Sequence, residues 1–85
     1  MNLVFSPRSK KQLDKLPLVI RKKAYKQFVF LSSNPNYPSL HAKKMSGSDI
    51  YEGRIDYHYR FTYTSNEEQI LILMVGVHDA GLGKK

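Results

Sequence analysis

The chain has 85 residues, no cysteine and a formal net charge of +7. This length suits one small core, so we expect residues 1–85 to form a single domain without an enclosed cofactor cavity. The lack of cysteine excludes disulfides and thiolate metal sites and suits a reducing compartment. No stretch reaches the roughly eighteen apolar residues that span a bilayer, and no signal peptide is recognisable. We therefore expect a cytoplasmic protein without membrane contact.

Positive charge is concentrated near the start of the chain. Eight of the fourteen Lys and Arg residues lie between Arg8 and Lys26, and Asp14 is the only acidic residue among them. Such a surface favours a polyanion or an acidic protein as partner. On charge alone, a solvated helix face explains the cluster equally well.

The first half of the chain predicts a strand and two helices. Residues 2–5 read as a short strand, and Ser6-Pro7 starts a helix, because Ser accepts hydrogen bonds from first-turn amides and Pro has no amide hydrogen to leave unsatisfied. We expect this helix to end near Lys15. After Pro17, apolar residues recur at helical spacing and predict a second helix: Ile20, Ala24, Phe28 and Leu31.

The second half predicts a sheet. Residues 32–38 hold two Pro and two Asn, which end the helix, and a loop is expected up to residue 50. Three strands follow, with tight turns at 56–58 and 65–67: Ile50–Ile55, Tyr59–Thr64 and Gln69–Val77. The last is apolar on both faces, which favours an interior position. The predicted fold is α+β, ordered β-α-α-β-β-β, with a helical hairpin packed on a small, mostly antiparallel sheet.

The strand at 50–55 has one polar face. Its period of two places Glu52 and Arg54 together and puts Tyr51 and Ile55 on the opposite face. An exposed ion pair of Glu52 with Arg54 or Lys44 is one interpretation of this polarity, and a reactive site is the other. The tyrosines of this region are expected to pack on the sheet: Tyr51, Tyr57, Tyr59 and Tyr63.

Five short motifs follow one another along the chain. They are Phe5-Ser6-Pro7, the helix break Leu16-Pro17, the segment 40–47 (LHAKKMSG), Tyr59-Arg60-Phe61-Thr62-Tyr63 and Val75-Gly76-Val77-His78-Asp79. In this order they resemble the RelE/ParE superfamily of bacterial toxins from type II toxin–antitoxin pairs. The match is nearest to the branch of RelE, YafQ and HigB. That resemblance implies a RelE-like toxin domain and a ribosome-dependent endoribonuclease that cuts mRNA in the decoding site.

The resemblance also implies roles for particular residues. Metal-free RNA cleavage needs a base for the ribose 2′-hydroxyl, cations for the developing phosphorane charge and an acid for the leaving oxygen. Arg60 and Arg54 would hold the phosphate, and His78 would be the acid. His41 and Glu52 remain open as the base, with His58 third. Residues expected to contact RNA or phosphate are Lys43, Lys44, His58 and Asp79, and those expected to dock on the ribosome are Arg8, Lys10, Lys11, Lys22, Lys23 and Lys26.

Some residues depart from the family pattern. Glu52 stands where RelE has a lysine, His58 stands where YafQ-like toxins have an aspartate, and the end of the chain lacks the aromatic residue that several members carry. Two other functions therefore stay open, a ParE-like inhibitor of DNA gyrase and a catalytically degenerate homologue that only binds antitoxin.

The resemblance and the composition also predict partners. We expect a cognate antitoxin rich in Asp and Glu, the ribosome and mRNA, and a monomer in the free state. No cofactor is expected, and no metal, because the three histidines lack ligand spacing.

Overall fold

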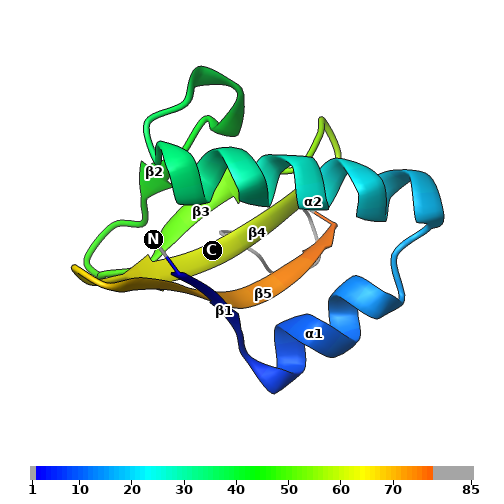
Figure 1. Ribbon diagram of the computed structural model, residues 1–85, viewed down its shortest axis with the longest axis horizontal. Coiled ribbons are helices and arrows are strands. Elements are labelled where there is room, and N and C mark those ends of the chain that lie inside the picture. Colours follow the sequence, from blue (N-terminus) through cyan, green and yellow to red (C-terminus); the bar gives the residue numbers. More distant parts are fainter. Residues whose placement is uncertain (1, 78–85) are drawn as a thin grey trace.

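The computed structural model describes residues 2–77 and shows one five-stranded sheet with two helices. The helices are α1 (Pro7–Asp14) and α2 (Leu18–Ser33), followed by a short 3₁₀ turn, η1 (Pro38–Leu40). The strands are β1 (Asn2–Phe5), β2 (Lys43–Lys44), β3 (Tyr51–Arg54), β4 (Tyr59–Ser65) and β5 (Gln69–Val77). Their order is β1-β5-β4-β3-β2, with β1 parallel to β5 and the other pairs antiparallel. In Figure 1, α2 crosses one face of the sheet and α1 lies beside β5.

This architecture confirms the predicted α+β fold and the interior position of the last strand. The loop predicted up to residue 50 is wrong at Lys43 and Lys44, which pair with Glu52 and Tyr51 on β3. Two lysines have no apolar alternation that indicates a strand. They are extended because the edge of β3 offers unpaired backbone groups. Within residues 2–77, neither helix is long and apolar enough to cross a bilayer.

The start of α1 is fastened to a bulge in β5. Thr62 of β4 pairs with Met74 of β5, and the next residue, Tyr63, pairs with Ile72. Leu73 of β5 is therefore an extra residue without a partner on β4. Such a bulge leaves backbone groups outside the ladder. Side chains of α1 and its cap satisfy them: Ser9 Oγ donates to Ile72 O at 2.9 Å, Ser6 Oγ donates to Leu73 O at 3.0 Å, and Val75 N donates to Gln12 Oε1 at 2.8 Å.

The bulge also changes which residues of β5 face the core. Because one residue is extra, the alternation changes phase at Leu73, and Ile70, Ile72 and Val75 are all buried in the core. A strand without a bulge would turn Ile72 and Val75 to opposite faces.

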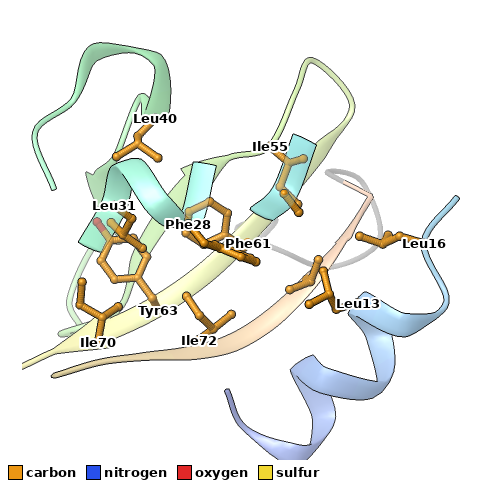
Figure 2. Packing of buried hydrophobic residues seen from close by; sticks show 12 residues of the cluster. Leu13, Leu16, Phe28, Leu31, Leu40, Ile55, Phe61, Tyr63, Ile70 and Ile72 are labelled. Atoms are coloured by element: carbon orange, nitrogen blue, oxygen red, sulfur yellow. The ribbon is translucent and has the colours of Figure 1, made fainter. Parts of the chain in front are cut away.

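Phe61 lies at the centre of the core, which Figure 2 shows from close by. Its ring meets that of Phe28 from α2 edge to face, with centroids 5.1 Å apart. Leu13 and Leu16 approach from the α1 side and Leu40 from the segment after α2. This cluster holds the helices and the loop on one face of the sheet and leaves the charged residues of β3 and β4 on the other face.

The prediction that four tyrosines pack on the sheet is confirmed for three of them. Tyr51 and Tyr63 stack with centroids 5.4 Å apart, and Tyr59 packs against the core. Tyr57 is 76% exposed, so the prediction is wrong there. Its place in the turn between β3 and β4 gives its side chain no neighbouring strand to cover.

A glycine is required on β3 opposite Phe61. A Cβ at Gly53 would lie 2.9 Å from the Cε1 and Cε2 atoms of that ring and nearer still to Cζ. Phe61 is fully buried and cannot withdraw. We expect Gly53→Ala to lower the free energy of unfolding by about 1 to 3 kcal/mol, measured by urea denaturation. The double variant Gly53→Ala with Phe61→Leu should lose less free energy of unfolding than the sum of the losses in the two single variants. The reason is that the smaller leucine side chain leaves room for the added methyl group. Additive losses would show that the ring is not the obstacle.

Burial, and secondarily the neighbouring Tyr51, raise the pKa of the Tyr63 hydroxyl above its ordinary value of 10.0. The unfolded chain therefore loses this proton at lower pH than the folded protein. The stability that the group contributes is fully present below about pH 10 and is lost as the pH rises toward the raised pKa. We expect wild type to lose free energy of unfolding more steeply than Tyr63→Phe above about pH 10 in urea denaturation. The control is Tyr57→Phe, at an exposed position, which should follow wild type. Parallel profiles for wild type and Tyr63→Phe would contradict the assignment.

Candidate functional site

A cleft of about 440 Å³ opens on the polar face of the sheet. It is lined by His41, Ala42, Lys43, Glu52, Gly53, Arg54 and Arg60. Tyr51 and Tyr63 belong to the core, so strand alternation turns Glu52 and Arg54 to the opposite face. Five of the residues that the sequence predicts to be functional therefore come together in one place.

The strand register places the charged residues of the cleft in pairs that lie directly opposite one another. Arg54 lies directly opposite Arg60 on β4, and Lys43 lies opposite Glu52 on β3. Like charges in directly opposed positions repel one another. With three cations and one carboxylate, the cleft suits an anion that binds between the cations, and a phosphate diester has the required negative charge and oxygens that accept hydrogen bonds.

Arg60 is held in place by the turn between β3 and β4. Its Nη1 donates to the backbone oxygens of Asp56, Tyr57 and Tyr59 at 2.7, 2.8 and 3.3 Å. The side chain is 9% exposed. A guanidinium has five N–H donors, and the Nε and Nη2 donors of Arg60 bond to no acceptor within residues 2–77. One edge of the group is thus structural, while the other donors remain available to a ligand.

Glu52 is a buried carboxylate without a partner among residues 2–77. It is 7% exposed, and its Oε2 has no hydrogen bond within residues 2–77. The ion pair with Arg54 or Lys44 is not formed, since the one ion pair of this part of the chain joins Lys23 to Asp56 at 3.6 Å. Arg54 is also incompletely bonded, because its buried Nε has no acceptor in the part of the chain that the structure describes. Buried polar atoms are rarely left unpaired, so this pair marks a place built for more than stability.

His41 enters the cleft from the loop. It caps η1 in a left-handed conformation with φ 46° and ψ 41°, next to the fully buried Leu40. A residue other than glycine adopts this conformation at a cost of roughly 1 kcal/mol or more. The turn that buries Leu40 thereby exposes the neighbouring imidazole at the cleft.

The remaining predicted residues lie elsewhere. Lys44 alternates with Lys43 and lines a separate hollow with residues 45–49. His58 is exposed in the turn, against the ring of Tyr57 at a centroid distance of 4.9 Å. His78 and Asp79 lie outside the described residues. The six predicted docking cations are all exposed on α1 and α2: Arg8, Lys10, Lys11, Lys22, Lys23 and Lys26.

Another cation of the basic cluster has a structural role that the charge pattern did not indicate. Nη2 of Arg21 donates to the backbone oxygens of Asp14 and Leu16, each at 3.2 Å, and so ties the end of α1 to the start of α2. Residues 2–77 contain no group of three or more His, Asp or Glu side chains that could hold a metal ion.

Comparison with known proteins identifies the fold. No protein-family model and no curated protein matches the sequence. Solved structures do match. A YoeB/ParE toxin from Agrobacterium tumefaciens has a TM-score of 0.79 at 15% identity, over 92% of this chain and 99% of that chain. A chain of the archaeal RelE-RelB complex from Pyrococcus horikoshii matches with a TM-score of 0.78 at 21% identity, over 94% of this chain and 97% of that chain.

A third match is a chain of the E. coli RelBE toxin-antitoxin complex, with a TM-score of 0.75 at 23% identity, over 92% of this chain and 96% of that chain. At these identities the likeness shows the fold. The chain has a RelE-like fold, and the resemblance to the RelE/ParE superfamily is confirmed at that level.

Arg60 can be tested for its structural role alone. We expect Arg60→Ala to lower the free energy of unfolding by about 2 to 3 kcal/mol, because three backbone oxygens lose a charged donor. Arg60→Lys should recover only part of this lost stability, since the lysine ammonium lacks the planar, forked geometry of the guanidinium donors. Urea denaturation gives the values. The control is Arg8→Ala, an exposed position on α1, which should change stability by less than about 0.5 kcal/mol. Equal stability of Arg60→Ala and the control would refute the turn contacts.

Proposed function

We propose that this chain is the toxin of a type II toxin–antitoxin pair and that it cuts mRNA in the decoding site of the ribosome. One observation carries the proposal. The cleft brings an imidazole, three cations and a carboxylate that has no partner in the described part of the chain to one face of the sheet. These are the groups that metal-free cleavage of a phosphodiester requires. The RelE-like fold supports the same conclusion, since the solved structures that share it are of toxins and toxin-antitoxin complexes.

The residues of the cleft fit the steps of the reaction. Arg54 and the free donors of Arg60 hold the oxygens of the scissile phosphate, and Lys43 adds a third positive charge. Glu52 takes the proton of the ribose 2′-hydroxyl, because no other group of the described chain occupies its carboxylate. The 2′-oxygen then attacks phosphorus, and the bond to the 5′-oxygen breaks to leave a 2′,3′-cyclic phosphate. The leaving 5′-oxygen takes its proton from the general acid, the role that the sequence gives to His78.

The proposed setting follows from charge. The exposed cations of α1 and α2 dock on ribosomal RNA, where a basic surface is attracted to the phosphate backbone. An antitoxin rich in Asp and Glu complements the net charge of +7 and holds the toxin inactive in the cytoplasm. The free toxin is a monomer of one domain.

A binding module without chemistry is the second candidate, as in a ParE-like inhibitor of gyrase. The observation that favours it is the turn bonding of Arg60, since three backbone oxygens already occupy Nη1. In that case the arginine would serve the turn, and the cleft would contact a protein partner.

Toeprinting of mRNA on programmed ribosomes tests the nuclease proposal. We expect wild type to cut in the decoding site and Glu52→Gln to cut at least about a hundredfold more slowly, because an amide of the same shape cannot accept the proton. The matched control is Glu68→Gln in the exposed turn between β4 and β5, which should cut as wild type does.

Three results would count against the proposal or part of it. Cleavage that survives in Glu52→Gln would reject this residue as the base. No cleavage by wild type on varied codons would reject the nuclease. Altered DNA supercoiling in growth-arrested cells, with translation intact, would favour the gyrase inhibitor.

A further inference from the structure

A second cleft, of about 450 Å³, lies on the other side of Arg54. Its walls include Lys23, Lys26 and Phe30 of α2, Tyr37 of the following loop, and Asp56 after β3. Arg54 lines this cleft as well as the first one. The two hollows therefore adjoin at one residue, Arg54, and a chain of linked phosphates held there would extend from one into the other.

An ordered pair of aromatic rings forms one wall of the second cleft. Phe30 and Tyr37 stack with centroids 4.1 Å apart and an angle of 14° between the planes. Phe30 packs against the core, whereas Tyr37 is 38% exposed. Backbone hydrogen bonds hold Tyr37 on both sides, from its own N to Asn34 O at 2.9 Å and from Leu40 N to its O at 3.1 Å. The exposed ring is thus fixed before any ligand arrives, which lowers the entropic cost of stacking on it.

Gln27 fixes the loop to the sheet at the floor of this cleft. Its Nε2 donates to the backbone oxygens of Ser39 and Arg54 at 3.1 and 2.7 Å, and Ser39 Oγ donates to its Oε1 at 3.2 Å. The amide is 7% exposed. The distance between the aromatic wall and Arg54 is therefore set by a buried side chain.

The charges that remain free in this cleft are positive. The carboxylate of Asp56 is occupied, because its Oδ1 accepts from the amides of His58 and Tyr59 at 2.9 and 3.0 Å and its Oδ2 pairs with Lys23. Lys26 and Arg54 have no ion pair within residues 2–77. A ligand of this cleft meets two aromatic side chains beside two cations that have no ion pair within residues 2–77.

We propose that the second cleft binds one unpaired nucleotide of single-stranded RNA, the neighbour of the nucleotide that is cut. Its base stacks on Tyr37, and its phosphates lie between Lys26 and Arg54. Aromatic platforms next to cations are how proteins hold single strands, and the volume falls within the range of small-ligand sites. An acidic peptide would satisfy the cations but would leave the aromatic wall without a flat partner. The inference rests on the proposed function, which places RNA in the first cleft.

Binding of RNA that cannot be cut tests this inference separately from catalysis. The probe is a fluorescein-labelled, fully 2′-O-methylated hexanucleotide, and fluorescence anisotropy measures its Kd. We expect Tyr37→Leu to weaken binding about tenfold or more, within the range for loss of one stacked base. Tyr37→Phe and Tyr37→Trp should stay within about twofold of wild type, because either ring can stack. The matched control is Tyr25→Leu, an exposed tyrosine of α2 outside this cleft, which should bind as wild type does.

An abasic scan of the same probe identifies the partner of Tyr37. One abasic position should weaken binding to wild type about tenfold and leave binding to Tyr37→Leu unchanged, because the stacking partner is already absent there. Lys26→Gln should reduce the salt dependence of log Kd by roughly 0.7. Urea denaturation of every variant checks that the fold is kept.

Several outcomes would overturn the inference. They are equal affinity of wild type and Tyr37→Leu, an equal loss in Tyr37→Phe and Tyr37→Leu, an abasic effect that persists in Tyr37→Leu, and no RNA binding by wild type. An acidic peptide that binds in place of RNA and depends on Tyr37 would assign the cleft to a protein partner instead. If toeprinting shows no cleavage while the probe still binds through Tyr37, the nuclease proposal fails and the RNA-binding cleft remains.

Discussion

The packing of the Phe61 ring over Gly53 is the constraint on which the site depends. Phe61 and Gly53 lie opposite one another on β4 and β3, and the ring occupies the space that a side chain at position 53 would need. This contact fixes the register of the two strands. Because side chains alternate along a strand, the neighbours Glu52, Arg54 and Arg60 must then lie on the other face. A slip of one residue would bury these charges in the core and disperse the cleft.

Sequence reasoning predicted the features that depend on local pattern. The alternation at 51–55 located the polar face, and Ser6-Pro7 located the start of α1, where Ser6 accepts from the amide of Ser9 at 3.0 Å. It missed features that depend on residues far apart in the chain. Gln27 bonds to Ser39 and Arg54, and β2 forms only because the edge of β3 is near. The left-handed His41 and the second cleft are of the same kind, since each results from the packing of the loop after α2.

The charged side chains of the first cleft form few of the ion pairs and hydrogen bonds through which they would stabilise the fold. Glu52 lies opposite Lys43 and near two arginines, and yet forms no ion pair within residues 2–77. A buried carboxylate without a partner costs free energy, as does the opposition of Arg54 and Arg60. The apolar cluster around Phe61 on the other face must offset this cost. A ligand that places an anion between the arginines would remove part of it, so the site is arranged for a bound state more than for the free one.

Arg60 shows why the effect of a substitution on activity is hard to assign in a domain this small. The same guanidinium closes the turn at 56–59 and faces the cleft. Removing it changes stability and charge together, so lost activity in such a variant does not by itself make the arginine catalytic. Glu52 has no such second role in the described chain, because its carboxylate bonds to nothing there. Glu52→Gln, which puts an isosteric amide at this position, therefore alters the chemistry of the cleft while leaving the hydrogen bonds of the fold intact. Its effect on activity can be attributed to the lost carboxylate without a correction for stability.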